Sequence, residues 1–147
     1  MLVVDIENSV FDYQGENNVI ILPITGFVRM DGKLAARNSM TKEFFDTYPS
    51  LSKKWAYMIQ NNVLYPSFSS YGTELIGIVE RLHYASSIDK SSILDGFWYI
   101  RELSLQKPNH IFYFVEIGGE EEEKELREIF KESTNVVLLK ERKETHE

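Results

Sequence analysis

Residues 26–33 are the first candidates for chemistry, because two glycines, an arginine and a lysine in one short segment are residue types that bind phosphate. The run Gly-Phe-Val-Arg-Met-Asp-Gly-Lys is similar to a phosphate-binding P-loop. However, five residues separate its glycines where a P-loop has four, and Leu34 stands where a serine or threonine would bind magnesium. We therefore do not expect P-loop chemistry here.

Other familiar catalytic groupings are missing from the sequence. It has no cysteine, no Gly-x-Ser-x-Gly run, and three histidines, His83, His110 and His146, of which no two have the spacing of a helical metal site. His83 follows a predicted strand, where catalytic residues do occur, but a single histidine is more often structural or solvated. We expect neither a metal nor a cofactor.

Charge and composition restrict the class of partner. The 147 residues carry a formal charge of −7, whereas nucleic-acid binding needs a basic face that releases counterions, so we expect no nucleic-acid partner. No apolar run approaches the ~20 residues that span a bilayer, and the lack of cysteine fits a reducing cytoplasm. We expect one cytoplasmic domain over residues 1–147, without membrane contact, and a frayed charged tail from about residue 140.

The apolar pattern predicts the elements that must position any site. Continuous apolar segments indicate strands at residues 2–6, 19–24, 74–80, 110–115 and 135–139. Apolar residues at helical spacing indicate helices at residues 39–48, 52–60, 90–105 and 120–133, and residues 67–72 fit a loop. Strands that alternate with helices predict an α/β protein, a three-layer α/β/α domain with a mixed, largely parallel sheet.

The loop after the strand at 19–24 is the predicted centre of the site. In such a sheet, the crevice between a strand and the helix that follows it binds anions, because unpaired helix N–H groups point into it. Asn38 or Ser39 can cap the helix that follows, and Pro49 ends that helix.

The segment from residue 26 to residue 51 resembles the macrodomain family, in particular its branch of ADP-ribose-binding and ADP-ribosyl-glycohydrolase-like proteins, which includes many bacterial and phage members. That branch has a pattern similar to Gly-x-Val-[Lys/Arg]-x-[Asn/Asp]-Gly-x-Leu, followed by a helix that closes on Phe-Pro-Gly-Leu. Tyr-Pro-Ser-Leu at residues 48–51 resembles the close, and the first part is matched by Gly26, Val28, Arg29, Asp31, Gly32 and Leu34. The resemblance implies a macrodomain-like fold over nearly the whole chain.

The resemblance also implies which positions form the ligand crevice. The family's adenine-side aspartate falls at Ser9, and the asparagine that ends its second strand falls at Thr25. The lysine that some relatives use for catalysis falls near Leu82, which cannot do acid or base chemistry. The family's first diphosphate loop, Met-Gly-x-Gly, falls at residues 36–39, where both glycines are replaced, and its second diphosphate loop is shortened to residues 117–119, directly before Glu120. The candidate ligand-binding residues are therefore Ser9, Thr25, Gly26, Arg37, Asn38, Ser39, Ile117, Gly118, Gly119 and Glu120.

Charges at the two diphosphate loops oppose each other. Four glutamates at residues 120–123 begin the last predicted helix, where each stabilises the helix by about 0.3–1 kcal/mol and together they repel a diphosphate. Arg37 offsets them, because a guanidinium binds phosphate oxygens in a bidentate way. The alternative is a solvated first helical turn and an ordinary surface arginine.

Two functions follow from this interpretation. The first is a divergent macrodomain that binds ADP-ribose or a related nucleotide and hydrolyses an ADP-ribosyl bond through a positioned water, with no catalytic residue identified. The second is a non-catalytic macrodomain that binds a protein partner or sequesters a molecule, as a host-interaction or anti-defence factor. Aromatic residues suit such an interface, although they also fill cores, as expected for Phe97 and Trp98. The candidates are Phe27, Tyr57, Tyr65, Phe68, Tyr71, Tyr84, Trp98 and Tyr99.

Overall fold

The computed structural model describes residues 1–141, so most of the tail expected to fray, residues 142–147, lies outside the described part of the chain. The sequence predicts fraying from residue 140, but Lys140 and Glu141 belong to the last strand, β6 (Val136–Glu141). They pair with Asp5 and Ile6 of the first strand, which extends the ladder beyond the apolar residues that made β6 recognisable.

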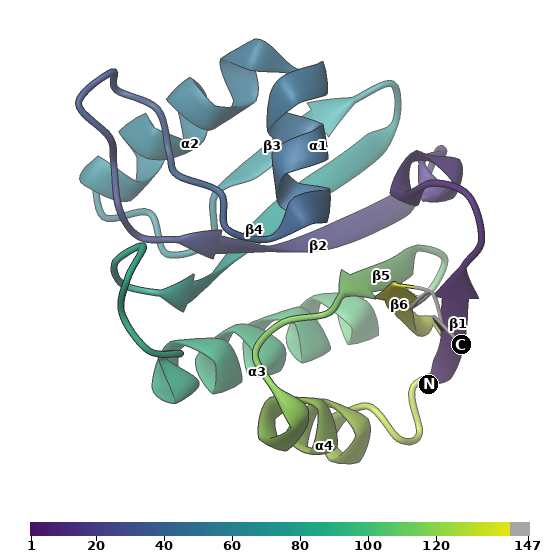
Figure 1. Cartoon of the computed structure of the whole chain (residues 1–147). Coiled ribbons are helices and arrows are strands. Elements are labelled where there is room, and N and C mark those ends of the chain that lie inside the picture. The colour runs from purple at the N-terminus through teal and green to yellow at the C-terminus, as the bar shows by residue number, and fades with distance from the viewer. Residues whose placement is uncertain (142–147) are drawn as a thin grey trace, which may run out of the picture.

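Six strands form one sheet. They are β1 (Leu2–Ile6), β2 (Asn18–Thr25), β3 (Ser67–Ser70), β4 (Thr73–Arg81), β5 (Ile111–Val115) and β6. Their order across the sheet is β1-β6-β5-β2-β4-β3, and every pair is parallel except β3 and β4 (Figure 1). The mixed, largely parallel sheet predicted from the sequence is confirmed.

The prediction of a loop at residues 67–72 is wrong for the first four residues, which form β3. This strand pairs antiparallel with β4 through a turn at Tyr71 and Gly72, both of which have positive φ angles. The sequence Ser-Phe-Ser-Ser at the edge of the sheet shows no run of buried apolar residues, and such a run was the basis for assigning strands.

Two helical layers cover the sheet. Helices α1 (Ser39–Thr47) and α2 (Pro49–Gln60) lie on one face, and α3 (Lys90–Gln106) and α4 (Glu120–Ile129) lie on the other (Figure 1). Successive residues of β2 point to opposite faces, so Ile20 and Leu22 join the core under α1 and α2 while Ile21 joins the core under α3 and α4. The structure is the predicted three-layer α/β/α domain.

The ends of several helices differ from the prediction. The helix α2 begins at Pro49, three residues before the predicted start, because proline suits the first position of a helix. The helix α4 ends at Ile129, with Phe130 as its C-cap. A short 3-10 helix, η1 (Val10–Tyr13), follows β1.

The expected burial of Phe97 is confirmed, whereas that of Trp98 is wrong. Phe97 is 0% exposed and Trp98 is 54% exposed. The helix α3 packs closely on β4 at Gly96, where a β-carbon would lie 2.7 Å from Ile78, and this contact fixes the buried face of α3. Because adjacent helical residues point in different directions, only one of the two aromatic side chains faces the sheet.

Candidate functional site

The carboxyl ends of the parallel strands lie along one edge of the sheet, and the candidate residues follow these ends. Thr25 and Gly26 end β2, and residues 117–120 follow β5, the neighbour of β2 in the sheet. Ser9 follows β1, which is three strand spacings from β2, or roughly 14 Å. The structure therefore brings Thr25 and Gly26 close to the loop after β5 and leaves Ser9 at the far end of the edge.

The first loop, residues 27–39, is held by side chains that the sequence assigns to the ligand. The Thr25 hydroxyl is buried and donates to the carbonyl of Ala35 at 2.7 Å. The Asn38 side chain accepts from the N–H groups of Met40 and Thr41 at 2.9 and 3.2 Å, which confirms its predicted role as N-cap of α1. These two polar groups hold the loop and the helix in place.

Among the candidate ligand-binding residues of this loop, Arg37 and Ser39 are exposed. The Arg37 guanidinium donates to the carbonyl of Tyr84, in the loop after β4, at 3.2 Å. Ser39 is exposed at the first position of α1. Arg37 thus ties two loops of the edge together through a contact that solvent can replace.

Ser9 serves the 3-10 helix that follows it. Its side-chain oxygen accepts from the N–H of Phe11 at 3.1 Å, and the Asp12 carboxylate accepts from the N–H of Ser9 at 3.3 Å. The hydrogen-bond acceptor expected for a ligand is therefore used within the chain as a cap.

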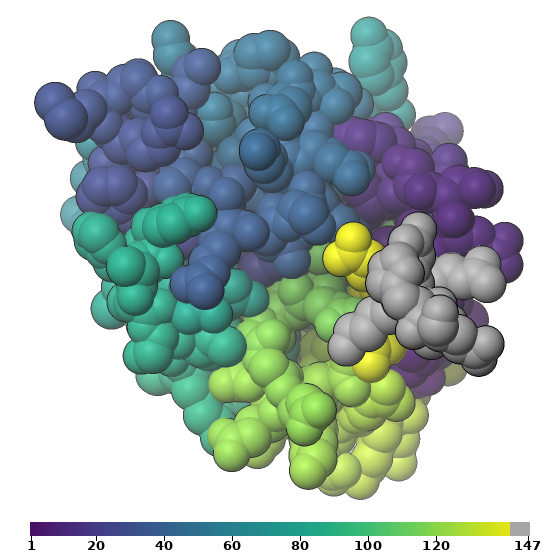
Figure 2. Space-filling view, viewed as in Figure 1, coloured from purple at the N-terminus to yellow at the C-terminus, as the bar shows by residue number. Residues whose placement is uncertain are grey.

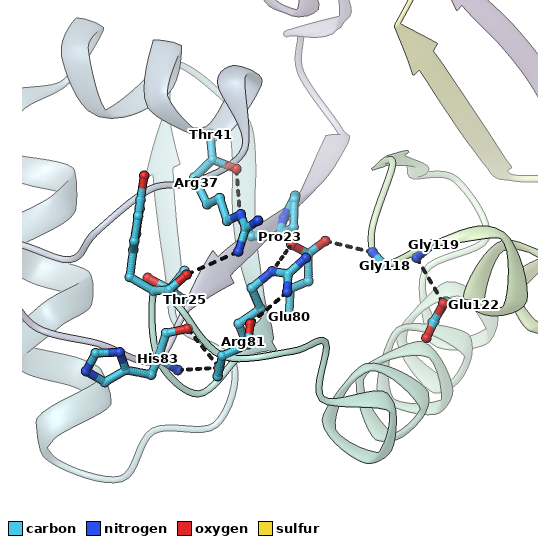
Figure 3. A network of polar contacts seen from close by, with 12 residues as sticks. Pro23, Thr25, Arg37, Thr41, Glu80, Arg81, His83, Gly118, Gly119 and Glu122 are labelled. Carbon is cyan, nitrogen blue, oxygen red and sulfur yellow. Dashed lines mark hydrogen bonds and ion pairs between the residues drawn. The ribbon is translucent and has the colours of Figure 1, made fainter.

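The second loop, residues 117–120, keeps its glycines and binds carboxylates. Gly118 has a φ of 77° and its N–H donates to Oε2 of Glu80 at 2.7 Å, while the N–H of Gly119 donates to Oε2 of Glu122 at 2.9 Å (Figure 3). Ile117 is buried and Glu120 is exposed. Both glycine N–H groups of the loop thus have an anionic acceptor from the chain itself.

Glu80 reaches Gly118 because of a β-bulge. Ile24 of β2 pairs with Val79 and Thr25 pairs with Arg81, so Glu80 is the extra residue on β4. A bulge bends the strand and re-aims its side chain. The Glu80 carbonyl accepts from the N–H of Asp89 at 2.8 Å, outside the ladder with β2.

Arg81 is the cation beside this carboxylate. Its Nε lies 3.7 Å from Oε1 of Glu80, and its Nη1 donates to the carbonyl of Ser86 at 2.7 Å. The side chains of Glu80 and Arg81 are 13% and 16% exposed. Sequence reasoning missed both residues, although two opposite charges that end an otherwise apolar strand would have indicated them.

A hollow of about 350 Å³ lies next to the second loop. Its lining includes Gly118, Gly119 and two charged side chains, Glu123 and Lys140. Lys140 lies 3.0 Å from Oε1 of Glu123, and the hydrogen bond between them lowers the pKa of the Glu123 carboxyl below its ordinary value. The four glutamates at the start of α4 therefore do not all face solvent. Glu122 is buried and accepts from the Gly119 N–H, and Glu123 is paired with Lys140.

Two hollows adjoin the first loop, with volumes of about 360 and 410 Å³, and they share Arg29, Ala36 and Lys42. Figure 2 shows the first loop with α1 in blue, the loop after β4 in blue-green and the start of α4 in light green, all meeting on one face. This face is the surface from which a ligand would reach the carboxyl edge.

Leu82 and His83, the two positions considered for catalysis from the sequence, lie in the loop after β4. Leu82 is 64% exposed and has no ionisable group, and the His83 ring packs on the ring of Phe27 at 4.3 Å between centroids.

Within residues 1–141, no group of three His, Asp or Glu side chains is arranged to hold a metal. In the same part of the chain, no helix is long and apolar enough to cross a membrane.

Comparisons with known proteins identify the fold. A scan against protein-family models and a search of curated proteins found no match. The macrodomain of Mycobacterium tuberculosis DarG aligns with 94% of this chain and 97% of its own, at a TM-score of 0.68 and 10% identity. A macrodomain protein from Streptomyces coelicolor aligns with 86% of this chain and 89% of its own, at a TM-score of 0.65 and 7% identity.

A third structure is Thermosipho africanus DarTG in complex with ADP-ribose. It aligns with 99% of this chain at a TM-score of 0.72 and 9% identity, and the match spans 43% of that protein. At such identities the likeness establishes the fold alone, and the macrodomain-like fold expected from the sequence is confirmed.

Proposed function

We propose that this chain, which has the macrodomain fold, binds ADP-ribose or a related nucleotide at the carboxyl edge of its sheet. The observation that carries the proposal is the hydrogen bond of 2.7 Å from the Gly118 N–H to the Glu80 carboxylate. It supports the proposal because a backbone donor next to a helix start that already binds one anion suits a phosphate oxygen as well. The structural neighbour solved with ADP-ribose supports the same class of ligand.

The first loop supplies the opposite wall in this proposal. Arg37 is exposed and holds the Tyr84 carbonyl by a single hydrogen bond of 3.2 Å. Exchange of that neutral carbonyl for a phosphate oxygen adds the attraction between opposite charges, and the guanidinium can bind two phosphate oxygens at once. In this arrangement Arg37 and Gly118 bind the diphosphate from two sides.

Hydrolysis of an ADP-ribosyl bond is the finer activity to test, and we expect binding without turnover. A water that attacks the distal ribose needs a base within hydrogen-bond reach. Leu82, which falls near the position of the lysine that some relatives use for catalysis, provides none. The proposed role is therefore that of a reader of the nucleotide.

Isothermal titration calorimetry with ADP-ribose, together with thermal unfolding at saturating ligand, tests the proposal. A ligand that binds only the native state raises its stability, by about 2.7 kcal/mol at a concentration of 100 Kd. Saturable heat and a raised Tm are expected with ADP-ribose, and none with free ribose. If millimolar ADP-ribose gives no heat and no rise in Tm, the proposal is overturned. Chromatography of a separate incubation with an ADP-ribosylated substrate reports any cleavage.

A second candidate function is binding of a protein partner without nucleotide. Exposed aromatic side chains favour it, because such residues are common interface hot spots: Tyr57, Tyr71 and Trp98 are 69%, 98% and 54% exposed. The two candidates separate in the calorimetric experiment, since a protein-binding module whose glycine N–H groups are permanently occupied gives no heat with ADP-ribose.

A further inference from the structure

We propose that Glu80 is a specificity determinant, an internal anion that competes with a ligand phosphate for the Gly118 N–H and so lowers the affinity for diphosphate ligands relative to neutral nucleosides. This inference rests on the proposed function, since it concerns the same crevice. If no ligand reaches the Gly118 N–H, Glu80 has no effect on ligand selectivity.

The contact between Glu80 and Gly118 joins two strands that are not neighbours in the sheet. Glu80 lies on β4 and Gly118 follows β5. Because β2 lies between these strands, β4 and β5 are two strand spacings, or roughly 10 Å, apart. The bulge at Glu80 and the left-handed φ of Gly118 together allow the two groups to meet at 2.7 Å (Figure 3). The carboxylate thus lies across the end of β2, at the edge where ligands bind in open α/β sheets.

The groups around the carboxylate suit the exchange of one anion for another. The carboxylate has two donors beside it. One is the Gly118 N–H. The other is Nε of Arg81, which is buried without a hydrogen-bond partner and lies 3.7 Å from the carboxylate. Arg81 is held in place through Nη1 by the Ser86 carbonyl, independently of Glu80. When Glu80 swings out, both donors stay where a phosphate oxygen can take the vacated position.

Competition of this kind has a definite effect on selectivity. Two anions cannot share the position, because juxtaposed like charges repel each other. A diphosphate ligand must displace Glu80, whereas a neutral nucleoside that occupies another part of the crevice leaves the carboxylate in place. Removal of the charge at residue 80 therefore increases the affinity for ADP-ribose and leaves the affinity for adenosine unchanged.

The first experiment measures ADP-ribose binding by calorimetry for the wild-type chain, Glu80→Gln and Glu80→Ala. Glutamine keeps an acceptor for the Gly118 N–H, so this variant preserves the fold if alanine does not, and it is expected to bind about tenfold more tightly than wild type. The matched control is Glu121→Gln, which removes the same charge from an exposed side chain paired with Lys90 at 3.3 Å. Wild-type affinity in Glu80→Gln, or an equal gain in the control, would overturn the inference.

A second readout separates this inference from the proposed function. Pyrophosphate is titrated into isotope-labelled protein, and the chemical shift of the Gly118 amide is followed by NMR. Glu80→Gln is expected to respond at a concentration about tenfold lower than wild type. If no variant binds ADP-ribose but this difference is seen, the inference stands and the nucleotide proposal fails; if the Gly118 amide is unaffected or responds equally in both proteins, the inference fails.

Discussion

The two loops that border the crevice use their polar groups in different ways. At the first loop, side chains hold the backbone in place: the Thr25 hydroxyl, at the end of β2, donates to the Ala35 carbonyl, and Asn38 caps α1. In the second loop, the N–H groups of Gly118 and Gly119 are directed at acceptors, and both acceptors are carboxylates of the chain. A side chain that holds the loop is not available to a ligand, whereas an occupied backbone donor takes part in an equilibrium that a ligand can shift.

The largest effect is expected from a matched pair of glycine substitutions, one in each loop. Gly118 and Gly32 both have a φ of 77°, but a β-carbon at Gly118 would lie 2.7 Å from Cγ of Glu122, whereas nothing lies within 4 Å of one at Gly32. Left-handed strain costs about 1 kcal/mol in either loop, and overpacking adds about 2 kcal/mol at Gly118. Urea unfolding measures the loss of unfolding free energy in Gly118→Ala and in Gly32→Ala. Equal losses in the two variants would contradict the tight packing of the second loop.

The next effect tests how the first loop is anchored. Thr25→Val removes the hydroxyl that donates to the buried Ala35 carbonyl, and an unsatisfied buried acceptor costs about 1–3 kcal/mol. The loss is measured as the fall in unfolding free energy in urea. Ser39→Ala, at an exposed position of the same segment, is the control and should change stability by less than about 0.5 kcal/mol. Similar values for the two variants would show that the loop does not depend on Thr25.

A smaller effect is expected for the cation of the first loop. Arg37→Ala should weaken ADP-ribose binding about tenfold, or about 1.4 kcal/mol, with little change in stability, since its contact with Tyr84 is exposed. Lys131→Ala removes the same charge from an exposed side chain that is paired with Glu128 at 2.9 Å, outside the hollows at the edge, so its affinity should stay within about twofold. Titration calorimetry compares them, and an Arg37→Ala variant with unchanged affinity would place the ligand elsewhere.

The smallest effect concerns pH at the second loop. Lys140 lowers the pKa of Glu123 below the ordinary value of 4.5, so the stabilisation from this pair is present above that pH and disappears as the pH falls through the lowered pKa. Lys140→Met should cost less than about 1 kcal/mol at pH 7, because the pair is partly exposed, and nothing at pH 2. Urea midpoints at the two pH values test this. A deficit that persists in acid would indicate lost packing rather than a lost ion pair.

Sequence reasoning succeeded where one local pattern determines the structure. The apolar run of β2 and the capping position of Asn38 are such patterns, and both are confirmed. It failed for β3, whose pairing depends on β4, and for Trp98, whose exposure depends on how closely α3 approaches the sheet at Gly96.

The site itself was predicted least well, because its central contact joins residues 38 positions apart. The pairing of Glu80 with Gly118 depends on a bulge in β4 and on the order of strands in the sheet, and no local run of residues encodes either. The sequence pointed to the carboxyl edge and to residues 117–120 as a ligand site, which stays a prediction, and it missed the Glu80 side chain that contacts this loop.

A crystal structure of the chain grown with millimolar ADP-ribose tests the central claim most directly. The claim is that the crevice is an anion site held by the protein's own carboxylate. The predicted result is a diphosphate oxygen within hydrogen-bond distance of the Gly118 N–H, with the Glu80 side chain rotated away and Arg81 still bound to the Ser86 carbonyl. A nucleotide bound elsewhere, with the contact between Glu80 and Gly118 intact, would contradict it.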